Sequence, residues 1–90
     1  MANLKDLIRL GLISPGTEIV WQRRVAKVSH SAVIDGNGII TTSDGISHKT
    51  PSGAAKHLNK NKPVDGWIAW KLKSNKVSLS ELRTEADGRN

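Results

Sequence analysis

Apolar residues follow two different periods along this chain, and the change between them marks the predicted elements. Leucine and isoleucine recur at i, i+3 and i+4 near the start, which predicts a short helix over residues 4–10 that ends at Gly11. Residues 17–22 and 25–34 are rich in β-branched side chains, and the second run alternates apolar and polar positions. The chain is therefore expected to begin with a helix followed by two strands.

Turn signals organise the middle of the chain. Asp-Gly-Asn-Gly at residues 35–38 predicts a hairpin turn, so a returning strand is expected at residues 38–42 and a short further strand at residues 46–49. Thr50 and Pro51 are the residue types that favour the N-cap and first position of a helix. That helix is expected to end before the next proline, because the residue before a proline disfavours helical geometry.

Residues 67–73 are expected to form another strand. In a strand the alternation places Trp67, Lys71 and Lys73 on one face and directs Trp70 to the opposite face, toward the core. Trp67 is thereby surrounded by lysines, although packing of Trp67 under the helix that Thr50 opens is an equally good explanation.

The chain is expected to end with a short helix over residues 78–83, because Ser78 and Glu81 have the spacing of a capping box. We expect a single domain over residues 1–84 and a flexible tail or linker at residues 85–90. The predicted fold is α+β: a small antiparallel sheet of four to five strands with three short helices.

Composition narrows the class of protein. The 90 residues include no cysteine, and 14 Lys and Arg against 8 Asp and Glu give a formal charge of +6. Between Lys49 and Lys76 lie seven lysines and one acid, Asp65. Such a local excess of positive charge favours DNA as the partner. The start is unlike a signal peptide and no apolar run has the length of a membrane span, so we expect no membrane partner and a cytoplasmic, nucleoid-associated or nuclear location.

No catalytic constellation is visible in the sequence. The three histidines, His30, His48 and His57, stand apart from one another and lack the spacing of metal ligands. Neither the paired acids of a metal-dependent nuclease nor a glycine-rich phosphate loop is present. We therefore expect no enzyme activity, no catalytic residue, no metal site and no cofactor.

Two elements are candidates for contact with DNA. The helix opened by Thr50 presents free N–H groups and the positive end of its dipole, which can hold a phosphate, although plain helix capping is the structural alternative. An aromatic ring among lysines, such as Trp67, can stack on an extruded base. The expected DNA contacts are Arg23, Arg24, Lys27, Ser47, His48, Lys49, Thr50, Ser52, Lys56, Lys71 and Lys73.

Three segments, in their order and spacing, resemble a known family. They are Asp-Gly-Ile-Ser-His at residues 44–48, Thr-Pro-Ser-Gly-Ala-Ala at residues 50–55 and Asp-Gly-Trp-Ile-Ala-Trp-Lys at residues 65–71. This pattern is similar to the RAMA domain, the restriction enzyme and adenine methylase associated domain.

The resemblance implies an accessory domain that binds double-stranded DNA and reads modified, for example methylated, bases. It also implies fusion to, or pairing with, a nuclease or methylase in a restriction or defence-related protein. Trp67, His48 and Asp65 are the expected contacts to a modified base; the family commonly has an aromatic residue in place of His48 and asparagine in place of Asp65. The alternatives are a protein-interaction module that positions a nuclease or toxin partner, and a sequence-independent nucleic-acid clamp.

Overall fold

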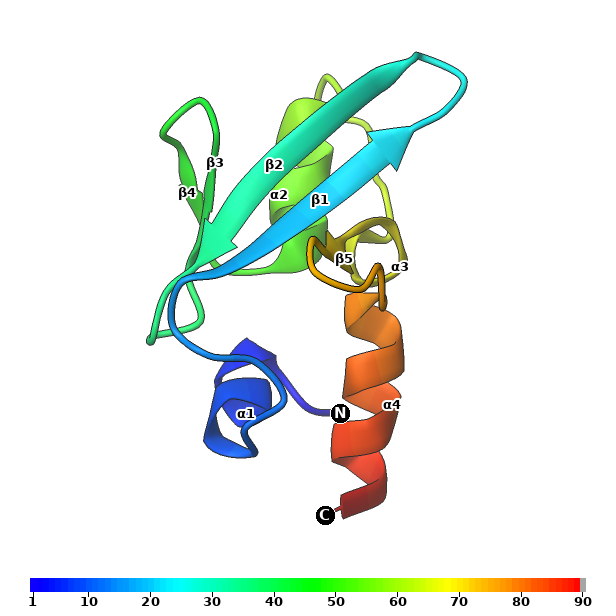
Figure 1. The fold of residues 1–90 in the computed structure, drawn as a ribbon. Helices are drawn as coiled ribbons and strands as arrows, with labels where there is room; N and C mark the ends of the chain where they lie inside the picture. The colour runs from blue at the N-terminus through cyan, green and yellow to red at the C-terminus, as the bar shows by residue number, and fades with distance from the viewer. Residues whose placement is uncertain (90) are drawn as a thin grey trace.

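A five-stranded antiparallel sheet and four helices make up residues 1–89, which the computed structural model describes (Figure 1). The elements in chain order are α1 (Leu4–Arg9), β1 (Thr17–Arg23), β2 (Val28–Ile34), β3 (Ile40–Thr42), β4 (Ser47–His48), α2 (Pro51–Leu58), α3 (Gly66–Ala69), β5 (Lys71–Leu72) and α4 (Leu79–Arg89).

The strand order is β4-β3-β2-β1-β5, and every neighbouring pair is antiparallel. The first four strands follow one another as hairpins, whereas β5 returns after two helices to pair with the other edge of β1. This confirms the predicted α+β class and the number of strands. The number of helices in the described part of the chain is four rather than three, because α3 forms where a strand was expected.

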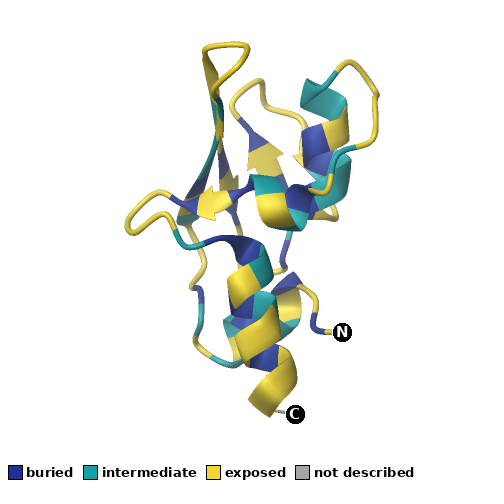
Figure 2. Ribbon diagram, turned by 90° about the vertical axis from the view of Figure 1, so that its right-hand side faces the viewer, coloured by how far each residue is buried: buried dark blue, intermediate teal, exposed yellow. Residues whose placement is uncertain are grey.

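Side chains alternate between the two faces of the sheet, and helices cover only one of them. Ile19, Ile34 and Ile40 are fully buried on the covered face, where α2 lies against the sheet in both views (Figures 1 and 2). The intervening side chains of β2, among them Ser29 and Ser31, are exposed on the other side. We call this uncovered side the open face.

The N-terminal turns of α2 and α3 meet backbone to backbone. A Cβ atom at Gly66 would lie 2.1 Å from the carbonyl carbon and oxygen of Pro51, so only glycine permits this approach. The Gly66 N–H donates to Ser52 Oγ at 3.0 Å, and the Trp70 indole N–H donates to the Pro51 carbonyl at 3.2 Å. We call this contact the α2–α3 junction. It holds Trp70 fully buried, which confirms its predicted place in the core.

The prediction of a strand from residue 67 is wrong over its first half. Asp65 caps a short helix there, since its Oδ1 accepts from the Trp67 N–H at 3.1 Å, and the strand is reduced to the two residues of β5. Trp67, Lys71 and Lys73 therefore do not share the face of one strand. The physical reason is the α2–α3 junction, which fixes the chain in a helical turn at Gly66 before the strand begins.

The last helix is longer than predicted. Ala86 is fully buried, and the Ala2 N–H donates to Asp87 Oδ1 at 2.6 Å, which ties the two ends of the chain together beside α4 (Figure 1). The flexible tail expected from residue 85 onward is therefore helical up to Arg89, because its apolar face is packed. The final residue of that tail, Asn90, lies outside the described residues.

Replacing Gly66 by alanine should break the α2–α3 junction. The added methyl group overlaps the Pro51 backbone, which cannot move without displacing α2, so we expect a loss of about 3 kcal/mol or more in the free energy of unfolding. Urea denaturation measures it. Gly88→Ala in α4 is the matched control, since no atom lies within 4 Å of the added Cβ; it should stabilise by up to about 1 kcal/mol. Equal effects of the two substitutions would show that the junction is not under steric constraint.

Candidate nucleic-acid interface

The outer half of the β1–β2 hairpin stands clear of the sheet as a two-stranded ribbon. β5 pairs only with Ile19 and Val20 of β1, and β3 pairs with β2 only from Ala32 onward, whereas β1 and β2 stay paired far beyond these points. Figure 1 shows this half projecting past the neighbouring strands, and Figure 2 shows that its tip is exposed. We call residues 21–30 the ribbon. A two-stranded ribbon has a cross-section that the major groove of B-DNA admits.

The ribbon carries positive charge and no acid. Arg23, Arg24 and Lys27 lie on it, and the nearest acidic residues in the sequence are Glu18 and Asp35. The side chains of Arg24 and Lys27 are exposed. The structure thus places three of the predicted DNA contacts on its most prominent projection.

A hydrogen bond joins the ribbon to the loop between α2 and α3. The Arg23 guanidinium donates to Asn59 Oδ1 at 2.7 Å, and the same loop carries the exposed lysines Lys60 and Lys62. The ribbon and this loop thus lie at the same end of the molecule (Figure 1). We call their five cations, Arg23, Arg24, Lys27, Lys60 and Lys62, the basic end. Sequence reasoning counted the two loop lysines in the basic segment but did not assign them to the site, because only the fold brings them beside the ribbon.

Two lysines of the basic end have left-handed backbones. The φ angles are 53° at Lys27 and 54° at Lys60. For an L-residue other than asparagine or aspartate this conformation costs about 1–2 kcal/mol, and glycine adopts it without that cost. Both turns would thus be easier to form with glycine than with the cation that is present.

Trp21 is the aromatic residue nearest these charges. It is half-buried, its ring lies 5.3 Å from that of His30 and 6.1 Å from that of Trp70, and the Arg23 guanidinium lies 4.9 Å from its centre. The Nε2 atom of His30 is buried with no hydrogen-bond partner among the described residues. Trp21 packs against the core on one side.

The hydroxyl groups at the start of α2 serve the fold. Thr50 Oγ1 accepts from the Gly53 N–H at 3.0 Å as the predicted N-cap, and Ser52 Oγ accepts from Gly66 in the α2–α3 junction. Lys49 and Lys56 beside them are exposed. The α2 start predicted to hold phosphate is therefore packed against α3, and its neighbouring lysines remain accessible.

Trp67 lies in a different environment from the one predicted. The Arg83 guanidinium of α4 sits 3.6 Å from the centre of its ring and covers it, while Asp65 caps α3 beside it. Lys73 pairs with Glu18 at 3.0 Å across the open face. The expected group of Trp67 with two free lysines is therefore not formed.

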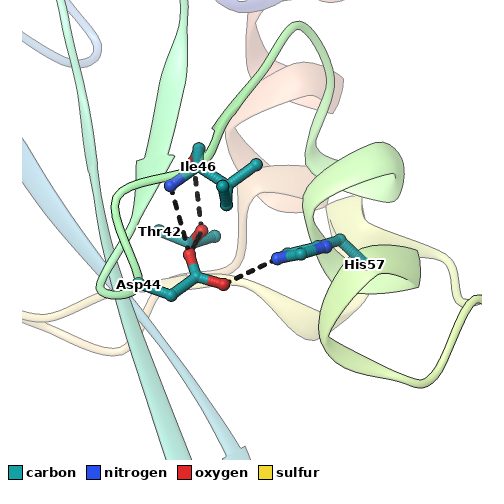
Figure 3. Close-up of polar contacts among 4 residues, drawn as sticks. All are labelled: Thr42, Asp44, Ile46 and His57. Atoms are coloured by element: carbon teal, nitrogen blue, oxygen red, sulfur yellow. Dashed lines mark hydrogen bonds and ion pairs between the residues drawn. The ribbon is translucent and has the colours of Figure 1, made fainter.

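The third expected base contact, His48, lies beside a polar cluster that links the β3–β4 turn to α2. Figure 3 shows the residues of this cluster, Thr42, Asp44, Ile46 and His57. The His57 Nε2 atom donates to Asp44 Oδ2 at 2.6 Å, and the rings of His48 and His57 lie 4.9 Å apart. Asp44 also accepts from the hydroxyl of Thr42 and from the Ile46 N–H. The sequence offered no signal for this cluster, since the pair Asp44 and His57 is separated by a turn, a strand and most of a helix.

Hydrogen bonding and burial shift the pKa values in these clusters. The bond from Thr42, and then that from His57, holds the pKa of Asp44 well below its usual range. Burial lowers the pKa of His48, and His57 lowers it further against the opposing effect of Asp44. Burial also lowers the pKa of His30, with a smaller contribution from Arg23. Both of these histidines are therefore harder to protonate than in the unfolded chain.

The open face carries the remaining candidates. Ser47 Oγ lies 3.1 Å from Thr41 Oγ1, and Lys71 is opposite Val20 at the β5 edge. A hollow of about 330 Å³ lies between β1, β2 and β3 on this face. Its lining is mostly apolar and hydroxyl groups, and its two charged residues are the Lys73–Glu18 pair described above.

Comparison with known protein families identifies the chain. The family model described as Restriction Enzyme Adenine Methylase Associated, abbreviated RAMA, matches residues 1–89. The chain belongs to the RAMA family. This confirms the resemblance seen in the sequence and assigns this RAMA domain to a family associated with restriction enzymes and adenine methylases.

Three further findings concern the chain as a whole. No curated protein matches this RAMA domain. Among residues 1–89, no group of three or more His, Cys, Asp or Glu side chains is placed to hold a metal ion. The same residues include no helix that combines the length and the apolar character needed to cross a membrane.

Acidification should destabilise the domain before its carboxylates titrate. The unfolded chain binds protons at histidine near pH 6.5, while His30 and His48 resist protonation in the fold, so the free energy of unfolding should fall between pH 7.5 and 5.5. Urea denaturation at the two pH values measures the change. The double variant His30→Gln, His48→Gln should show a flatter dependence, and an unchanged slope in that variant would contradict the assignment.

Proposed function

We propose that this RAMA domain is a non-catalytic module that binds double-stranded DNA through the ribbon and the basic end. The observation that carries the proposal is the projection of an isolated two-stranded ribbon with three cations and no acid, beside a loop that adds two lysines. A projecting element of this width suits a DNA groove, and the cations on it and beside it suit the flanking phosphates.

The cations divide into two sets. The tip of the ribbon enters the groove, with Arg24 and Lys27 at the phosphates that flank it, while Lys60 and Lys62 meet the phosphate backbone beside the groove. The bond from Arg23 to Asn59 fixes the ribbon relative to these lysines, so both sets engage the duplex together. Exposed lysines elsewhere, including those at the start of α2, extend the positive surface without forming part of this end.

We further propose that the domain reads modified bases on behalf of a nuclease or methylase module to which it is fused or with which it is paired. Association of the RAMA family with restriction enzymes and adenine methylases supports this reading, because such enzymes act according to the methylation of DNA. The domain would then reside with DNA in the nucleoid or nucleus, within a restriction or defence-related protein.

Binding to a DNA duplex should depend steeply on salt and on the charges of the ribbon. With four to five phosphate contacts, affinity should fall about 150- to 500-fold between 50 and 200 mM salt. Removing two contacts with Arg24→Gln and Lys27→Gly should weaken binding and reduce the slope of log affinity against log salt by about two. Fluorescence anisotropy with a labelled duplex measures both quantities.

The double variant Lys5→Gln, Arg9→Gln is the matched control, because it removes the same two charges from α1 at the opposite end of the molecule (Figure 1). It should leave the slope close to that of the wild type. Equal losses in the two double variants would show that net charge, and not the ribbon, determines binding. Absence of binding at 50 mM salt would favour the alternative of a protein-interaction module.

Modified DNA should be distinguished from plain DNA of the same sequence. Duplexes with N6-methyladenine, with 5-substituted cytosines and without modification form the panel, measured at one salt concentration. We expect at least one modified duplex to bind about fivefold or more tightly, since the phosphate contacts are common to all and only base contacts differ. Equal affinities across the panel would instead identify a sequence-independent clamp.

A further inference from the structure

A small pocket lies at the foot of the ribbon, along the stretch of β1 that has no strand beside it. β5 stops pairing at Val20, so the next residues of β1, Trp21 and Gln22, form an open edge that lines the pocket with Ile68 of α3. The volume is about 170 Å³. That is less than the roughly 300–1,000 Å³ of sites for drug-sized ligands, so the pocket suits one small group or ring system.

Three cations line this pocket. Arg24 comes from the ribbon, Lys71 from β5 and Lys76 from the turn that follows β5. The lining includes no acid, and none of the three cations is in an ion pair within residues 1–89. Unpaired cations that line one concavity favour an anionic ligand, and a phosphate above all.

Lys76 has a left-handed backbone, with a φ angle of 63°. Glycine or asparagine would form this turn more easily than lysine. Lys76 thereby repeats the feature seen at Lys27 and Lys60 in the basic end. A cation at a position that disfavours it conformationally is an independent indication that its charge is used.

The remaining walls offer surfaces for a base. Trp21, which is half-buried, and Ile68, which is 60% exposed, line the pocket with an aromatic ring and an apolar side chain. Gln22 is exposed. Its side-chain amide has one donor and one acceptor, which match the N7 acceptor and the N6 donor at one edge of adenine. By contrast, the larger hollow on the open face has its two charges paired with each other and offers no free cation.

We propose that this pocket takes up one base that bound DNA presents out of its base stack, with the adjoining phosphate held by the three cations. The base lies against Trp21 and Ile68 with Gln22 at its edge, and the phosphate lies among the three cations. The proposal rests on the proposed function, because a ribbon seated in a groove brings the duplex alongside the pocket. It transfers the base contact expected at Trp67 to Trp21, since Trp21 lines the pocket and Trp67 does not, and since Arg83 lies 3.6 Å from the centre of the Trp67 ring whereas Arg23 lies 4.9 Å from that of Trp21.

Two 20-base-pair DNA duplexes test the proposal, one fully paired and one with a single unpaired adenine. Extruding an unpaired base costs little, so the wild type should bind the second duplex about fivefold or more tightly, as expected from stacking of one base. Lys76→Gly and, separately, Ile68→Ser should reduce this ratio to near one. Both variants should fold, since one relieves a left-handed lysine and the other changes an exposed side chain.

Lys60→Gly is the matched control, because it removes the same charge from the same backbone conformation outside the pocket. It should weaken binding to both duplexes by a similar factor and preserve their ratio. Repeating the measurement with N6-methyladenine as the unpaired base shows whether the same pocket senses the methyl group. If it does, the ratio of affinities for the methylated and the plain unpaired adenine should change in Ile68→Ser.

The outcomes separate the two proposals. If the wild type binds neither duplex, the proposed function is wrong. If it binds both equally, or if the two pocket variants keep the wild-type ratio, the duplex interface stands and the nucleotide pocket is overturned. A ratio lost in the pocket variants and kept in Lys60→Gly supports the pocket.

Discussion

The backbone contact between Gly66 and Pro51 is the constraint on which most of this domain depends. It forces α3 against the start of α2, where the Gly66 N–H and the Trp70 indole each complete a hydrogen bond. Trp70 is thereby fixed at the centre of the core, and the chain leaves α3 in the direction that lets β5 join β1. Because β5 is only two residues long, the edge of β1 opposite β2 has no partner beyond Val20, and the ribbon is free to project.

This constraint also explains the residues by which the family is recognised. Proline, serine, glycine and the second tryptophan of the motif all take part in the α2–α3 junction, so the motif specifies how two helices meet. The chemistry of binding can then vary on surfaces that the junction positions but does not occupy. The cations of the basic end, and those of the pocket at the foot of the ribbon, take no part in the packed contacts of the motif. Lys71 is the one among them that belongs to a motif segment, where it directly follows the second tryptophan, and its side chain is exposed.

Much of the fold was predictable because its signals are local. The turn at Asp35, the Thr50 cap and the alternation of β2 act within a few residues. The elements that these signals specify, β2, β3 and α2, lie near their expected bounds. The error at Trp67 has a clear cause, since tryptophans three residues apart satisfy helical spacing as well as a strand with one tryptophan on each face. The sequence alone does not distinguish a helix from a strand here, because the outcome depends on the contact of Gly66 with Pro51, which lies 15 residues earlier in the chain. The gathering of Lys60 and Lys62 beside the ribbon depends on tertiary contacts in the same way.

Backbone strain gives one criterion for separating charges that are used from charges that merely keep a surface soluble. Most exposed lysines here lie on relaxed backbone, where they cost nothing. Among residues 1–89, three of the four non-glycine residues with positive φ are nevertheless lysines, and the fourth is Asn61, a residue type that tolerates this conformation. Selection for stability alone would favour glycine or asparagine at all four positions. These lysines lie on the ribbon, beside it, or in the pocket at its foot, so the strain is concentrated where the proposed DNA would be bound. That is the pattern expected when binding and not folding sets the residue type.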